Sequence, residues 1–140
     1  MISADVIHGF SGSILAKKYD SATPTPKFHL ELWELFTSPN KCVAAAAPRG
    51  HGKSTAITYA YLLANVLFRE RRFVVIVSDT EAQAINFLSD IKNELKDNED
   101  LVNLFGIKGF LKDSETSITL EMVSHVTGSI LNFDRTGCHV

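Results

Sequence analysis

The sequence has no long apolar run, no excess of basic residues and few cysteines, and each of these features argues against a class of protein. No apolar stretch approaches the roughly 20 residues that cross a bilayer, so we expect no membrane association. Residues 1–20 lack the charged segment and following apolar segment of a secretory signal. The formal net charge of -2 argues against a dedicated nucleic-acid-binding module. We therefore expect a cytoplasmic protein, in which any DNA contact comes from a local patch or from a further part of the chain.

The two cysteines, Cys42 and Cys138, lie far apart in the sequence and match no metal-ligand spacing. We expect both to be free thiols in a reducing compartment. With 45% hydrophobic and 21% charged residues, the composition is ordinary for a globular protein and unlike that of a disordered chain. A chain of 140 residues is long enough to bury an apolar core.

A glycine-containing loop lies between an apolar run and a helical pattern. The loop reads APRGHGKST from Ala47 to Thr55. It matches the phosphate-binding pattern G-x-x-x-x-G-K-[ST] at Gly52, Lys53 and Ser54, whereas Ala47 replaces the first glycine. That first glycine mainly eases the turn, so alanine is a tolerable departure. The sequence therefore predicts a nucleotide-binding P-loop.

The matched residues each have a chemical task in such a loop. Gly52 lets the backbone approach phosphate oxygens without a side chain in the way, and the amides at the start of the helix favour an anion. Lys53 reaches the β- and γ-phosphates, and the Ser54 hydroxyl takes one position on Mg²⁺. The expected ligands are therefore ATP and Mg²⁺, with Ser54 as the metal ligand. The predicted binding residues are Pro48, Arg49, Gly50, His51, Gly52, Lys53, Ser54 and Thr55.

Arg49 lies inside the loop, four residues before Lys53. Two interpretations stay open for it. It is either a solvated arginine on a turn, or an arginine finger in cis that neutralises the charge developing at the γ-phosphate. Arg49 and Lys53 are the predicted catalytic residues. His51 is most simply a loop residue with an exposed ring, because a general base requires a water geometry that a sequence does not define.

Helical periodicity and prolines divide the chain. The apolar spacing predicts four helices, one within residues 1–20 and three over Phe28–Phe36, Ser54–Arg69 and Glu81–Lys96. Two prolines in Ser21–Lys27 interrupt the helical pattern. We predict an amino-terminal helix and a proline-containing linker over residues 1–27, followed by a partial P-loop ATPase domain over residues 28–140.

Apolar runs outside the helices predict strands. Lys41–Ala47 feeds the loop and Phe73–Val77 is β-branched and uncharged, so both are expected to be buried strands. Strand and helix then alternate, which implies a right-handed parallel unit. Ser117–Leu120 and Val123–Phe133 are predicted to form short strands or a hairpin. The predicted fold class is α/β, a P-loop NTPase of the RecA/ASCE type with a parallel sheet flanked by helices and incomplete at its carboxy end.

Three segments together resemble one known family. PRGHGKST at Pro48–Thr55, preceded by FHLELWELF and followed by VVIVSDTEAQA, is similar to the ATPase domain of phage terminase large subunits. The resemblance runs from about Phe28 to Gly106. It implies that Arg49 holds the family's proposed arginine-finger position, and that the region around Phe28, His29 and Trp33 helps to hold adenine.

The resemblance also implies a function and partners. Terminase large subunits join an ATPase, which drives DNA into viral procapsids, to a metal-dependent nuclease. The implied partners are double-stranded DNA, a portal protein and a small terminase subunit, with self-association in the full motor and a place in the host cytoplasm.

The sequence departs from the family after residue 106. The candidate Walker B residue is Asp134, but Arg135 follows it where a water-activating glutamate is expected, and no acidic cluster for a nuclease is present. Two alternatives therefore stay open. One is a helicase-like or other P-loop ATPase that acts on nucleic acid, and the other is a truncated product that binds nucleotide without hydrolysing it.

Overall fold

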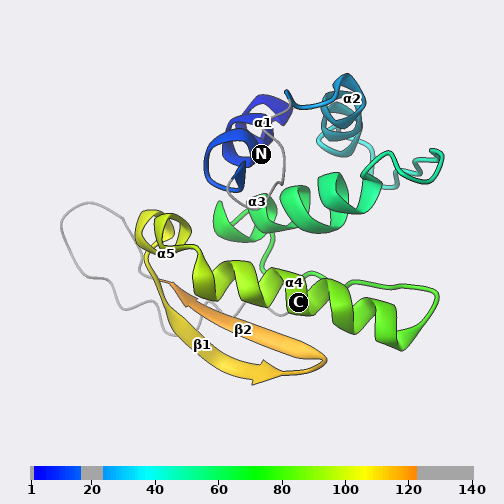
Figure 1. Cartoon of the computed structure of the whole chain (residues 1–140). Coiled ribbons are helices and arrows are strands. Elements are labelled where there is room, and N and C mark those ends of the chain that lie inside the picture. Colours follow the sequence, from blue (N-terminus) through cyan, green and yellow to red (C-terminus); the bar gives the residue numbers. More distant parts are fainter. Residues whose placement is uncertain (1, 17–23, 123–140) are drawn as a thin grey trace. The chain divides into compact units, whose positions relative to one another are not determined.

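The structure is a computed structural model that describes residues 2–16 and 24–122 (Figure 1). The chain divides into two compact units, Met1–Glu70 and Arg71–Val140. The predicted boundary at residue 27 lies inside the first unit, because the amino-terminal helix packs on the helices that follow it. In the described residues, no helix has both the length and the apolar character required to cross a membrane.

The first two helices confirm the sequence prediction. Helix α1 (Ala4–Ser13) begins after Ser3, whose hydroxyl accepts a hydrogen bond from the Val6 amide at 3.4 Å and so caps the helix. Helix α2 (Lys27–Phe36) begins directly after Pro26. A proline at this position is well tolerated, because the first amides of a helix have no intrahelical acceptor.

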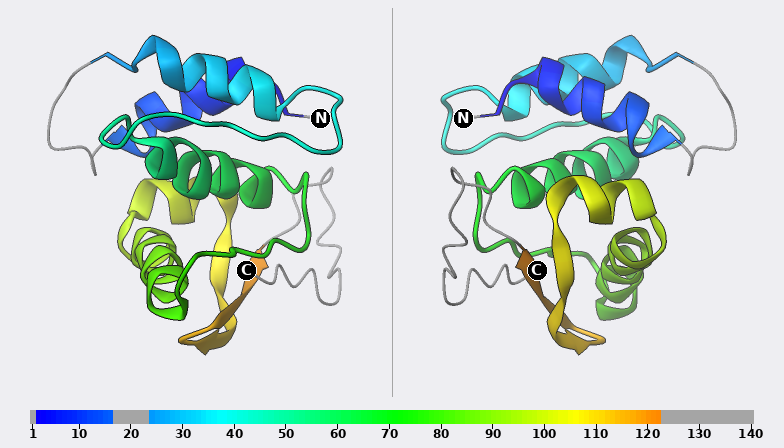
Figure 2. Two further views of the ribbon diagram at one scale, coloured as in Figure 1. Left: turned by 90° about the vertical axis from the view of Figure 1, so that its right-hand side faces the viewer. Right: turned by 90° about the vertical axis from the view of Figure 1, so that its left-hand side faces the viewer.

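The third predicted helix is present, but its first part is wider than an α-helix. Thr55–Tyr61 forms a π-helix, η2, which continues without a break into α3 (Leu62–Leu67). Every residue of α3 is buried. Helices α1 and α2 both contact η2, so three helices enclose the core of this unit (Figure 2). Its buried apolar side chains include Ile7, Phe10, Leu15, Trp33, Leu63 and Val66.

The second unit contains two helices and a hairpin. Helix α4 (Glu81–Asp97) confirms the fourth predicted helix and is capped by Thr80. Helix α5 (Glu99–Phe105) is capped by Asn98 and ends at Gly106, which has a φ of 61°. Glycine tolerates this left-handed conformation at a helix end, and the chain then turns into a strand.

The hairpin consists of β1 (Ile107–Ser114) and β2 (Ser117–Met122), paired antiparallel. Strand β2 confirms the strand predicted at residues 117–120. The expected partner, Val123–Phe133, lies outside the described residues, and β2 instead pairs with β1, which the sequence analysis did not predict. The core of this unit is formed by apolar side chains from α4, α5 and β2. They are Leu88, Ile91, Leu95, Leu101, Ile118 and Leu120.

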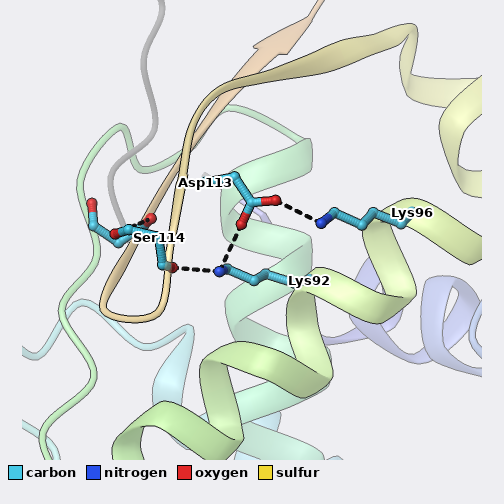
Figure 3. Close-up of polar contacts among 5 residues, drawn as sticks. Lys92, Lys96, Asp113 and Ser114 are labelled. Atoms are coloured by element: carbon cyan, nitrogen blue, oxygen red, sulfur yellow. Dashed lines mark hydrogen bonds and ion pairs between the residues drawn. The ribbon is translucent and has the colours of Figure 1, made fainter.

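Two lysines of α4 fasten the hairpin to the helix (Figure 3). The Nζ atoms of Lys92 and Lys96 lie 2.7 and 2.6 Å from the two carboxylate oxygens of Asp113. Lys92 also donates to the carbonyl oxygen of Ser114. The hydrogen bonds that the Asp113 carboxylate accepts, with that from Lys92 the larger cause and that from Lys96 the second, lower the pKa of Asp113 from its ordinary value of 3.8.

The two segments predicted as strands of a parallel sheet are not strands in this structure. Lys41–Ala47 has no regular secondary structure, and within Phe73–Val77 only Phe73 forms an isolated β-bridge. The hairpin is the only sheet among residues 2–16 and 24–122. A parallel strand needs neighbours whose backbones complete its hydrogen bonds, and an apolar sequence alone does not supply them. The parallel arrangement therefore stays a prediction.

The side chains of residues 73–77 nevertheless alternate between exposed and half-buried, as they do along an extended chain. Phe73, Val75 and Val77 are 65%, 63% and 86% exposed. Val74 and Ile76 are half-buried, and together with Phe73, Val75 and side chains of α4 they line a cavity of about 380 Å³. The segment therefore lies beside a helix, and Val77 is its most exposed apolar residue.

Candidate nucleotide-binding site

The predicted phosphate-binding residues form a loop that turns directly into a helix. Gly50 and Gly52 have φ values of 82° and 65°, in the left-handed region that favours glycine. Helical structure begins at Lys53, and the Ala56 amide donates to the Gly52 carbonyl oxygen at 2.9 Å. The loop-to-helix half of the predicted strand–loop–helix is therefore present in this chain.

The start of this helix has the general properties of an anion site. The first amides of a helix lack intrahelical acceptors, and the helix dipole favours negative charge there. In this chain those amides belong to Lys53, Ser54 and Thr55. Ser54 and Thr55 are exposed, and the Ser54 side chain makes no capping hydrogen bond to the helix.

Lys53 is folded back onto the beginning of its own loop. Its Nζ atom donates to the carbonyl oxygens of Ala47 and Pro48, the second at 3.2 Å. Both acceptors are neutral, whereas a phosphate oxygen carries negative charge and attracts the ammonium group by charge as well as by hydrogen bonding. A phosphate oxygen is therefore a better partner for this ammonium group than either carbonyl.

The other loop side chains point away from the core. Pro48, Arg49 and His51 are exposed, and the His51 ring lies near its own backbone, with Nδ1 3.3 Å from the Arg49 carbonyl oxygen. The exposed position of Arg49 is consistent with both interpretations, the solvated arginine and the arginine finger. The exposed His51 ring agrees with its reading as a loop residue.

Helix α2 supports the loop through contacts that the sequence analysis missed. The His29 Nε2 atom lies 3.0 Å from the His51 carbonyl oxygen, and the Trp33 indole donates to the Ala56 carbonyl oxygen at 2.9 Å. The Phe28 ring meets the His51 ring edge-on, with 5.9 Å between their centroids. The sequence indicates that His29 and Trp33, four residues apart, share one face of a helix, but not that this face contacts the loop.

The same contacts bear on the adenine interpretation. Trp33 is only 1% exposed and packs in the core of the unit. It therefore has no free ring face on which a base can stack. Phe28 and His29 are half-buried beside the loop.

The residues present fit a magnesium ion that is shared with a nucleotide. Mg²⁺ is usually held by one or two protein oxygens together with substrate phosphates and waters. Ser54 offers an exposed hydroxyl at the helix start. Residues 2–16 and 24–122 contain no group of three or more histidine, cysteine or acidic side chains that is placed to hold a metal. The candidate Walker B residue, Asp134, lies outside the described residues.

Of the two cysteines, both predicted to be free thiols, Cys42 is free and lies exposed, and Cys138 lies outside the described residues.

Comparison of the chain with protein-family models, with curated proteins and with solved structures found no match. The candidate site is therefore defined by the loop itself and by the side chains of α2 that contact it.

Proposed function

We propose that the loop from Ala47 to Ala56 binds ATP together with Mg²⁺. The observation that carries the proposal is a loop with two left-handed glycines, Gly50 and Gly52, that delivers Lys53 and Ser54 to the first turn of a helix. This combination gives a phosphate group backbone amides, a lysine and a hydroxyl at one point.

Binding of a triphosphate exchanges the partners of Lys53. Its ammonium group leaves the Ala47 and Pro48 carbonyl oxygens and takes the β- and γ-phosphates, to which it is attracted by charge. The Ser54 hydroxyl supplies one ligand to Mg²⁺, which neutralises charge on the same phosphates. Arg49, which is exposed in the loop, is proposed to stabilise the charge that develops during hydrolysis.

We also propose that the chain is part of a larger α/β domain with a parallel sheet. Residues 73–77 support this, because Val75 and Val77 are 63% and 86% exposed although the sequence is that of a central strand. A strand with apolar residues on both faces requires cover on both faces. Lys41–Ala47 is proposed as the neighbouring strand that leads into the loop.

The wider function rests on the sequence resemblance alone. We propose that the chain is the ATP-binding part of a DNA-packaging terminase large subunit, with double-stranded DNA, a portal protein and a small terminase subunit as partners of the full motor. Arg135 beside Asp134 favours a second candidate, a product that binds nucleotide without hydrolysing it. A helicase-like ATPase would share the same loop chemistry.

The binding proposal is tested by titrating the 140-residue protein with a fluorescent ATP analogue and Mg²⁺. Lys53→Ala removes the charge that meets the phosphates and should abolish most of the binding. Lys41→Ala removes an exposed lysine of the same unit and should leave the affinity unchanged. Equal affinity of wild type and a folded Lys53→Ala variant would refute the assignment.

A further inference from the structure

We infer that helix α2 is a clamp on the phosphate-binding loop, and that His29 is the positioning residue that holds the loop in its binding conformation. The inference rests on the proposed function, because the loop is the proposed ATP site. It goes beyond that proposal by assigning a role to a residue that lies outside the loop and outside the P-loop sequence pattern.

The clamp has two contact points, one before and one after the segment Gly52–Thr55, in which the loop turns into the helix. His29 contacts the carbonyl oxygen of His51, and Trp33, one helical turn later, contacts the carbonyl oxygen of Ala56. The segment Gly52–Thr55 lies between these two acceptors. Both contacts use carbonyl oxygens, so the amides at the start of the helix are left for an anion.

The His29 ring also fills the space beside Gly52. A Cβ atom at Gly52 would lie 2.9 Å from the His29 Nε2 atom, closer than real Cβ atoms approach a neighbour, and 3.2 Å from Cε1, which is tighter than most such contacts. Gly52 also has a φ of 65°, which disfavours any other residue. The glycine therefore serves two needs at once, the approach of phosphate and the approach of the His29 ring.

The chemistry of the contact identifies what His29 must provide. A carbonyl oxygen only accepts hydrogen bonds, so the His29 Nε2 atom carries a hydrogen and donates it to the His51 carbonyl oxygen. A glutamine side chain offers an N–H donor without the ring, and a phenylalanine offers a ring without a donor. These two substitutions separate the hydrogen bond from the packing.

The experiment compares binding of a fluorescent ATP analogue with Mg²⁺ by the full chain and three variants. His29→Phe should weaken affinity by about fivefold to tenfold, the effect of one lost hydrogen bond. His29→Gln should restore affinity to within about twofold of wild type. Glu34→Ala is the control, because Glu34 is an exposed residue of the same helix. It should bind like wild type.

A second measurement does not depend on nucleotide. ¹⁵N relaxation of the Gly50 and Gly52 amides should report a more mobile loop in His29→Phe than in wild type or His29→Gln. The amides of α3, in the core of the same unit, should stay equally rigid in all variants and so show that each one is folded.

These readouts separate the clamp from the function on which it rests. If wild type binds no analogue, the proposed function fails, and the relaxation data alone decide whether His29 orders the loop. If wild type binds and His29→Phe binds equally well, the clamp is overturned. Equal loop mobility in wild type and His29→Phe overturns the clamp as well. If His29→Gln loses as much affinity as His29→Phe, the hydrogen bond is excluded as the basis of the clamp.

Discussion

The two units of the chain use polar side chains for different tasks. In Met1–Glu70, the side chains of His29 and Trp33 contact backbone carbonyls, and the backbone that they hold belongs to a loop and the helix after it. In Arg71–Val140, Lys92 pairs with the carboxylate of Asp113 and fastens a hairpin to a helix. The first arrangement holds a main-chain shape through backbone acceptors, and the second depends on ionisation.

The units also differ in where they keep their apolar residues. Every residue of α3 in the first unit is buried. In the second unit, Phe73, Val75 and Val77 are mostly exposed although the segment is strongly apolar. The first unit therefore contains a fully buried helix behind its candidate site, whereas the second contains an apolar segment that is mostly exposed at Val75 and Val77. Substitutions in the two units should differ accordingly in what they disturb.

The largest effect is expected at Arg49 and would sharpen the functional side of this comparison. In a longer protein that contains this chain and hydrolyses ATP, Arg49→Ala should lower kcat on the order of 10³-fold and leave KM nearly unchanged. The reason is that a finger acts on charge present only in the transition state. Steady-state phosphate release measures both constants, with Lys41→Ala as the control. A rise in KM with kcat preserved would reduce Arg49 to a ground-state contact.

Trp33 tests whether the first unit depends on the packing of α2. Trp33→Ala removes a side chain that is 1% exposed, together with its hydrogen bond to the Ala56 carbonyl. It should lower the free energy of unfolding by about 3–5 kcal/mol. Urea unfolding followed by circular dichroism measures the loss. Leu35→Ala, on the same helix but 39% exposed, should cost far less. Similar losses for the two variants would mean that α2 is not anchored through Trp33.

A substitution at Val77 tests whether the apolar segment Phe73–Val77 of the second unit is exposed. Its side chain is 86% exposed, so Val77→Lys should change the free energy of unfolding by no more than about 0.5 kcal/mol. The added charge should also reduce self-association of the chain, as measured by light scattering. Asn103→Lys adds the same charge at another exposed position and should leave association unchanged. A large loss of stability in Val77→Lys would indicate that the segment is covered in this chain.

The smallest effect is expected at Asp113, where the comparison predicts a dependence on pH. Because its pKa is lowered by Lys92 and Lys96, the carboxylate stabilises the folded chain above its ordinary pKa of 3.8. This contribution is lost as the pH falls below that value towards the folded-state pKa. Asp113→Asn should therefore lower the urea midpoint at neutral pH, and the difference from wild type should shrink in acid. Asp90→Asn, on the exposed surface of α4, should show no such difference.

The helices were predictable because their signals are local. The apolar spacing in Phe28–Phe36 and Glu81–Lys96, and the proline before the former, lie within each segment itself. The π-helix at Thr55–Tyr61 was not predictable, because nothing in those residues distinguishes one helical hydrogen-bond pattern from the other. Local sequence therefore predicted that a helix exists, but not its geometry.

The strands and the clamp depend on partners that are distant in the sequence, and local sequence patterns do not identify such partners. Phe73–Val77 has the composition of a central strand, yet a strand assignment requires a pairing neighbour that composition does not identify. Strand β1, which contains Gly109 and several charged residues, was missed because its pattern is weakly apolar. The loop residues were recognisable from their motif, but the contact of His29 with the loop joins positions 22 residues apart.

The burial of Trp33 has an optical consequence. The chain contains one tryptophan, and it lies in the first unit with its indole N–H bonded to the helix that follows the loop. Intrinsic emission excited at the indole band therefore originates from that unit alone. Because a buried indole emits at shorter wavelength than a hydrated one, a red shift would report the opening of that unit. The native protein therefore contains a built-in fluorophore beside its candidate ATP site, and no label needs to be attached.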